Sequence, residues 1–102
     1  MEIKYIKNNL NLIIYIYGDL DECSASYAKV ILDKLILSDL NINKVVFDLS
    51  GITFMDSTGI GLLIGRYKKL KKFNIDSYIT GASVSTEKVI ELAGLYRIMP
   101  KQ

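Results

Sequence analysis

Histidine is absent from this sequence of 102 residues, and cysteine occurs once, as Cys23. Without histidine the chain lacks the commonest general base and the commonest metal ligand. A single cysteine cannot form an internal disulfide, so nothing indicates an oxidising compartment. The net charge of +2 is too small to indicate a nucleic-acid or membrane partner through bulk electrostatics.

Long hydrophobic runs are also missing. No apolar stretch approaches the ~20 residues of a membrane span, and residues 1–9 contain no signal-peptide core. The composition, 50% hydrophobic and 24% charged, is that of an ordinary globular protein. We therefore expect a single cytoplasmic domain over residues 1–102.

Strand-like and helix-like patterns alternate along the chain. Runs of β-branched and aromatic residues indicate strands, and the run LIIYIY is typical of a strand covered on both faces. Apolar residues at helical spacing, with capping residues before them, indicate helices. Strands are expected at 3–8, 12–17, 44–48, 75–80 and, as a short last strand, 97–99; helices are expected from Asp21 or Ser24 to about Leu37, from Ser57 to about Lys72, and from Ser83 to Ala93, with Gly94 after it.

This order of elements predicts an α/β fold. The first two strands are close enough in sequence to form an antiparallel hairpin, whereas the later strands are separated by helices and require right-handed crossovers. The expected architecture is a mixed sheet of four to five strands with helices packed against it.

The segment 45–67, VVFDLSGITFMDSTGIGLLIGRY, reads as a buried strand, a loop and an amphipathic helix that begins near Asp56 and Ser57. Aspartate, serine and threonine are common at such starts because their side-chain oxygens accept bonds from free backbone N–H groups. Composition alone therefore favours a capping role for Ser57. The alternative is reversible phosphorylation, since a phosphate there would meet the positive end of the helix dipole.

Two enzymatic interpretations of this segment are weak. A serine nucleophile at Ser57 needs a base with an orienting partner, and the sequence offers no histidine. Gly59, Gly61 and Gly65 are spaced somewhat like a dinucleotide-binding fingerprint. However, eight residues, 50–57, are expected to separate the strand from these glycines, which fall inside the helix. We expect the glycines to allow close packing of the helix against the sheet.

Two charged clusters have ordinary explanations. A basic cluster in 66–72 is expected to be a solvated helix face whose cations complement the helix C-terminus, rather than a nucleic-acid site. Asp19, Asp21 and Glu22 form a small acidic rim with too few oxygen ligands for a metal, and Cys23 is expected to be partly buried. The basic residues are Arg66, Lys68, Lys69, Lys71 and Lys72.

The motif FMDSTGIG at 54–61, followed by LLIGRYK at 62–68, resembles the signature of STAS domains in anti-sigma factor antagonists. The resemblance is strongest to the sporulation branch, the antagonists of anti-sigma-F factors. Residues 18–21, GDLD, resemble the family's loop before its first helix, and 93–95, AGL, its segment after the third. The similarity covers nearly the whole chain and implies the STAS fold.

The resemblance implies a regulatory protein and not an enzyme. In that family the unphosphorylated antagonist binds an ATP-using anti-sigma factor of the serine kinase type and thereby releases a sporulation sigma factor. The kinase then phosphorylates the serine that matches Ser57, and a serine phosphatase restores it; Thr58 is the alternative acceptor. No cofactor, metal, nucleic acid or membrane is implied. The partner-binding residues carried over are Asp21, Asp56, Ser57, Thr58, Gly59 and Ile60.

Two other functions stay open at this point. The chain could be a STAS regulator of another pathway, such as a stress-response antagonist or a component of lipid transport. A small nucleotide-binding or hydrolytic domain that uses Ser57 and the glycines of 59–65 is the alternative from a different class.

Overall fold

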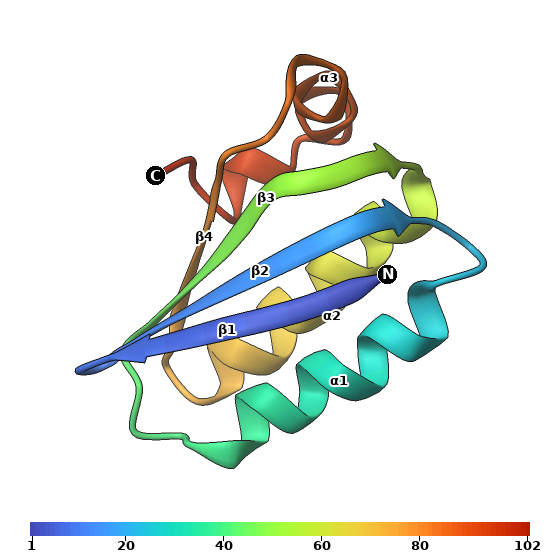
Figure 1. Cartoon of the computed structure of the whole chain (residues 1–102). Helices are drawn as coiled ribbons and strands as arrows, with labels where there is room; N and C mark the ends of the chain where they lie inside the picture. The colour runs from blue at the N-terminus through green and yellow to red at the C-terminus, as the bar shows by residue number, and fades with distance from the viewer.

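A computed structural model describes residues 1–102 and contains four strands, three α-helices and a 3₁₀ turn (Figure 1). The predicted helices are confirmed to within a few residues, as are the first two strands and the fourth. The elements are β1 (Glu2–Asn8), β2 (Asn11–Leu20), α1 (Ala25–Ser38), β3 (Lys44–Met55), α2 (Ser57–Lys72), β4 (Asp76–Thr80), α3 (Val84–Ala93) and the 3₁₀ turn Leu95–Arg97.

The sheet has the strand order β1-β2-β3-β4. β1 and β2 are antiparallel and are joined by a tight turn in which Asn9 adopts a φ of 58°. β2 is parallel to β3, and β3 is parallel to β4, with α1 and α2 as the crossovers. The mixed sheet, the N-terminal hairpin and the βα crossovers are therefore confirmed.

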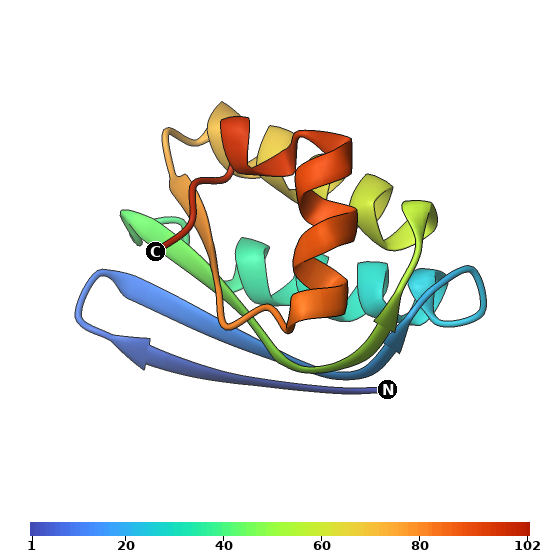
Figure 2. The same ribbon diagram turned by 90° about the horizontal axis from the view of Figure 1, so that it is seen from above.

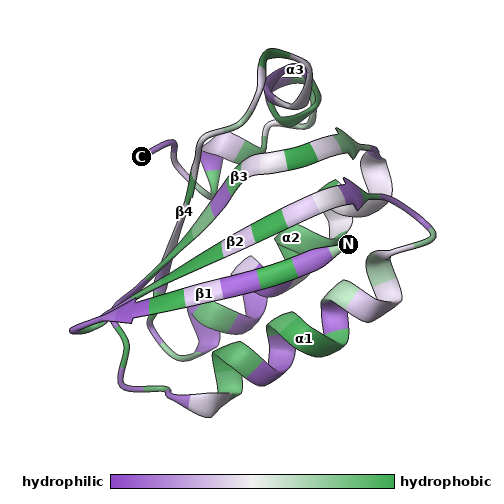
Figure 3. Ribbon diagram, viewed as in Figure 1, coloured by the Kyte–Doolittle hydropathy of each residue, from purple (hydrophilic) through white to green (hydrophobic).

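The helices gather on one face of the sheet (Figure 2). Leu12, Ile14 and Ile16 of β2 point to this face and are buried, whereas Ile13 and Tyr15 on the other face are only half-buried. Along β1, where hydrophobic and hydrophilic residues both occur (Figure 3), only Ile3 is half-buried and the other residues are exposed. The prediction that β2 is covered on both faces was wrong, because no helix crosses to the far side. No helix is long and apolar enough to span a membrane.

The C-terminal residues do not form the strand predicted at 97–99. Gly94 ends α3 in the left-handed conformation, with a φ of 71°, and the chain turns at once into the 3₁₀ turn. Only a single parallel bridge, between Ile79 and Lys101, continues the sheet beyond β4. The sheet thus has four strands, the lower end of the expected range.

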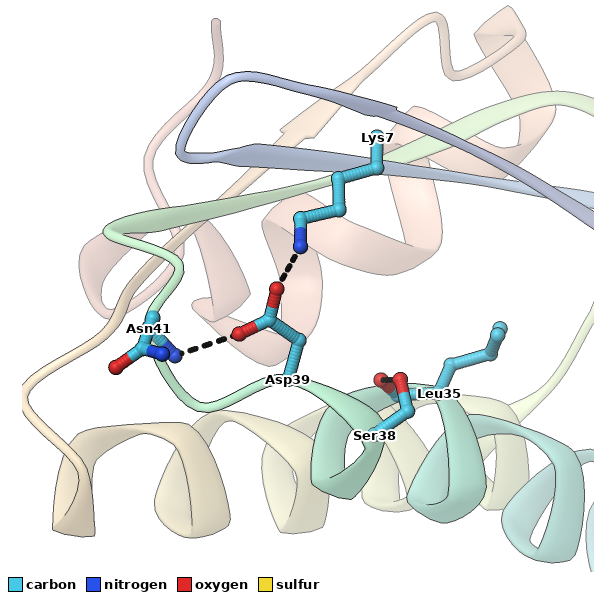
Figure 4. A network of polar contacts seen from close by, with 5 residues as sticks. All are labelled: Lys7, Leu35, Ser38, Asp39 and Asn41. Atoms are coloured by element: carbon cyan, nitrogen blue, oxygen red, sulfur yellow. Dashed lines mark hydrogen bonds and ion pairs between the residues drawn. The ribbon is translucent and has the colours of Figure 1, made fainter.

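A polar network anchors the edge strand β1 to the end of α1 (Figure 4). The Lys7 ammonium forms an ion pair with the Asp39 carboxylate, whose other oxygen accepts a bond of 2.9 Å from the backbone N–H of Asn41. At the last turn of α1, the Ser38 hydroxyl donates to the Leu35 carbonyl at 2.7 Å. These contacts fix the C-terminal end of α1 and the first residues of the connection to β3.

An ion pair between helices corrects the expectation for the basic cluster. The side chain of Arg66 is 7% exposed and lies between α1 and α2, where its Nε is 3.0 Å from Oδ1 of Asp33. Lys69 also approaches this carboxylate, at 3.2 Å. Arg66 is therefore part of the helix–helix contact, Lys69 is half-buried beside it, and the exposed residues of the cluster are Lys68, Lys71 and Lys72.

Candidate functional site

The junction between β3 and α2 is shorter than the sequence indicated. β3 does not end at Asp48 but continues to Met55, so Asp56 alone separates the strand from the helix. Ser50 and Gly51 read as a loop, yet β2 pairs with β3 past this point through two register shifts. Gly51 lies against the Tyr17 ring, where a Cβ would come within 2.3 Å of Cδ1.

Asp56 is the N-cap of α2, and this settles which residue starts the helix. Its Oδ1 accepts bonds from the backbone N–H groups of Thr58 and Gly59, at 2.9 and 3.2 Å. Ser57 is the first helical residue and is exposed, as is Thr58. Because Asp56 supplies the cap, the Ser57 hydroxyl is left free at the positive end of the helix dipole.

The loop between β2 and α1 lies beside this junction. Leu20 pairs with Met55, and the Leu20 carbonyl accepts a bond from the Asp56 N–H at 3.4 Å. Asp21 follows directly, and its Oδ1 accepts from the N–H groups of Cys23 and Ser24, so its carboxylate shapes the turn before α1. Cys23 is exposed, not partly buried as predicted.

A hydrogen bond between side chains ties the end of β2, just before this loop, to β3. The Thr53 hydroxyl donates to Oδ1 of Asp19 at 2.6 Å, across 34 positions of sequence. The Ser24 hydroxyl in turn donates to the Asp19 carbonyl at 2.7 Å. Four carboxylates, from the end of β2, the loop after it and the start of α2, therefore lie at the same end of the sheet. None of them forms an ion pair. They are Asp19, Asp21, Glu22 and Asp56.

Gly59 and Ile60 are buried beneath the exposed start of α2. Ile60 is 6% exposed and belongs to the hydrophobic core, so its side chain offers little surface to a partner. A Cβ on Gly59 would lie 2.6 Å from the Leu20 carbonyl oxygen and 2.8 Å from Met55 Cγ. Close packing is thus confirmed at Gly59. The same prediction was wrong for Gly61 and Gly65, where an added Cβ would meet nothing within 4 Å.

These glycines give a matched stability prediction. Gly59→Ala is expected to lower the free energy of unfolding by about 1–3 kcal/mol, because the added methyl overpacks a backbone contact. Gly61→Ala and Gly65→Ala should raise it by about 0.5–1 kcal/mol, because alanine favours the helix and meets open space. Urea denaturation of the three variants checks the difference in sign. A Gly59→Ala variant as stable as Gly61→Ala would contradict the packing account.

The site offers little to a cofactor. No group of three or more His, Cys, Asp or Glu side chains lies together closely enough to hold a metal. The short junction removes one objection to a dinucleotide fingerprint, but Gly59, Gly61 and Gly65 all lie within α2. In that fingerprint the glycines form the turn before the helix and let the pyrophosphate approach the backbone, so the arrangement does not fit.

Two residues near the site were missed by the sequence interpretation. Thr53 and Phe54 were placed in a loop, whereas they lie on β3, and Phe54 is 53% exposed three residues before Ser57. A large aromatic residue just ahead of a cap is the only signal in the sequence that could have drawn attention to this position.

Comparisons with known proteins agree on the fold and on the kind of relative. Residues 2–101 match the family model for the STAS domain. The chain is 27% identical over 89 residues to an anti-sigma F factor antagonist of Paenibacillus polymyxa, covering 87% of this chain and 75% of that protein. It is 34% identical over 55 residues to an anti-sigma-B factor antagonist of Staphylococcus aureus, covering 54% and 51%.

Solved structures show the same arrangement of strands and helices. The unphosphorylated form of the anti-sigma factor antagonist SpoIIAA superposes with a TM-score of 0.81 at 20% identity, covering 99% of this chain and 88% of that one. The phosphorylated form of SpoIIAA from Bacillus gives a TM-score of 0.72 at 20% identity, covering 99% and 91%.

Proposed function

The chain belongs to the STAS domain family, and on that premise we propose that it is an anti-sigma factor antagonist, a regulator without catalytic activity. The curated relatives support this, since they are antagonists of anti-sigma F or anti-sigma-B factors. We assign it to a sporulation sigma factor because the anti-sigma F relative aligns over 89 residues and the anti-sigma-B relative over 55.

The observation that carries the mechanism is the free, exposed hydroxyl of Ser57 at the first residue of α2. A phosphate there carries a charge of about −1.5 to −2 and meets the positive end of the helix dipole. That contact is worth ~0.3–1 kcal/mol near a surface, so the fold tolerates the modification. A partner packed over the same atoms would have to desolvate the phosphate, at a cost of several kcal/mol. Phosphorylation therefore changes the stability of the domain little and strongly weakens the complex with the partner.

The partner surface surrounds Ser57. Asp21, Asp56 and Thr58 flank it, while Gly59 and Ile60 hold the backbone in place beneath. The partner in this proposal is an ATP-bound anti-sigma factor of the serine kinase type, which also phosphorylates Ser57. A serine phosphatase that removes the phosphate restores the binding form.

Displacement of a sigma factor tests this function. Unphosphorylated protein should release the sigma factor from a preformed complex with the kinase-type anti-sigma factor of the same organism, followed by size-exclusion chromatography. Sigma F and sigma B pairs are tested in parallel, and release from the sigma F pair alone supports the sporulation assignment. Failure to release either sigma factor would contradict the antagonist function, and release only from the sigma B pair would contradict the sporulation assignment.

A further inference from the structure

A small hollow opens between the end of β3, just ahead of α2 in the sequence, and the first turns of α3. Its volume is about 130 Å³. α3 lies alongside β3 at this end of the molecule (Figure 1). The hollow combines apolar walls with hydroxyl groups, and the residues that line it are Thr53, Phe54, Met55, Ser85, Thr86 and Val89.

The hollow adjoins the start of α2 through Met55, which lines it and also lies against Gly59. Phe54 and Met55 lead directly into the cap Asp56, and Met55 Cγ lies under the start of α2 at Gly59. Thr53, which lines the hollow, is the same residue whose hydroxyl donates to Asp19 of the acidic rim (Asp19, Asp21 and Glu22). A partner that covers Ser57 therefore meets carboxylates on one side and this apolar hollow on the other.

We propose that the hollow receives one aliphatic side chain of the anti-sigma factor, and that basic residues of this partner lie next to it and face the acidic rim. This inference rests on the proposed function and extends its contact surface to α3. An apolar cavity of about 150 Å³ can hold a benzene molecule, so a hollow of this size has room for a branched aliphatic side chain. The carboxylates of Asp19, Asp21 and Glu22, none of which forms an ion pair, supply the charge complementarity for a basic partner surface.

Two phenylalanines provide a matched test. Phe54 and Phe73 are 53% and 40% exposed, but Phe73 follows the last turn of α2, a helix of 16 residues and hence about 24 Å from Ser57. Titration of the anti-sigma factor should show the Kd raised at least about 10-fold by Phe54→Ala and less than about 2-fold by Phe73→Ala. Phe54→Leu, which keeps an apolar wall, should bind nearly as well as the wild type.

A second variant covers the case in which Phe54→Ala fails to fold. Ser85 is exposed on the opposite wall, so Ser85→Trp plugs the hollow without disturbing the core, and it should weaken binding to a similar extent. Thermal melting of each variant verifies that it is folded.

The outcomes separate this inference from the proposed function. Unchanged affinity in both Phe54→Ala and Ser85→Trp, with binding still lost in Ser57→Asp, would overturn the hollow as a contact and leave the antagonist function standing. A wild-type protein that does not bind the anti-sigma factor contradicts the function and the inference together. Sedimentation of the isolated protein as a dimer that Phe54→Ala dissociates would identify a second copy as the occupant, against the proposal.

Discussion

Ser57→Asp is expected to bind the kinase-type anti-sigma factor at least about 100-fold more weakly than Ser57→Asn. The two side chains have nearly the same shape, so their comparison isolates the charge. The aspartate adds a fifth carboxylate to an end of the sheet where four others are not ion-paired. The basic residues proposed for the partner face Asp19, Asp21 and Glu22, so the partner surface over position 57 offers no matching cation. Burying the added carboxylate there costs about 3 kcal/mol or more, which corresponds to the stated factor.

Ser57→Ala completes this series. It should bind as the wild type does, because Asp56 caps α2 and the Ser57 hydroxyl makes no hydrogen bond within the protein. Isothermal titration of the anti-sigma factor with the wild type and the three variants measures these affinities. Equal affinities for Ser57→Asp and Ser57→Asn would count heavily against an electrostatic switch.

Arg66→Ala is expected to lower the free energy of unfolding by about 3 kcal/mol, since removing one member of a buried ion pair leaves the other charge without its partner. Asp33 would keep only Lys69, at 3.2 Å, between α1 and α2. The Asp33 side chain is 19% exposed, so the expected loss in the free energy of unfolding lies at the lower end of the range for broken buried pairs. Denaturation in urea measures the loss, and Lys68→Ala, on the exposed side of α2, should change stability by less than about 0.5 kcal/mol.

The double variant Asp33→Leu with Arg66→Met tests whether the loss in Arg66→Ala comes from the Asp33 charge that is left without its partner. Replacing a buried pair by apolar side chains of similar size is often neutral or stabilising, so the double variant should be more stable than Arg66→Ala. A double variant that loses as much stability as Arg66→Ala would contradict this reason, because methionine keeps the packing of the arginine stem and only the ion pair is lost.

Local patterns in the sequence predicted most of the fold. The helices follow from apolar spacing and capping residues, and Ser83 and Gly94 start and end α3 as expected. The end of β3 was missed because Ser50 and Gly51 are typical of a loop, whereas pairing with the long β2 holds them in the sheet. The buried position of Arg66 could not be read from a basic cluster, because its partner Asp33 comes from another helix.

In the candidate site, too, local features could be predicted from the sequence and long-range contacts could not. The start of α2 at Asp56 and Ser57 was visible in the sequence, since capping is a local interaction. The bond from Thr53 to Asp19 joins residues 34 positions apart, and the hollow beside Phe54 needs α3 as its second wall. Such features depend on how separate elements pack, and no spacing within one segment encodes them.

Mapping the phosphate is the most direct test of the switch at Ser57. The protein is incubated with its kinase-type anti-sigma factor and ATP, digested, and analysed by tandem mass spectrometry that separates Ser57 from Thr58. We expect one phosphate per chain on Ser57 and none in the Ser57→Ala variant. Phosphate on Thr58 or elsewhere, with Ser57 unmodified, would contradict the account.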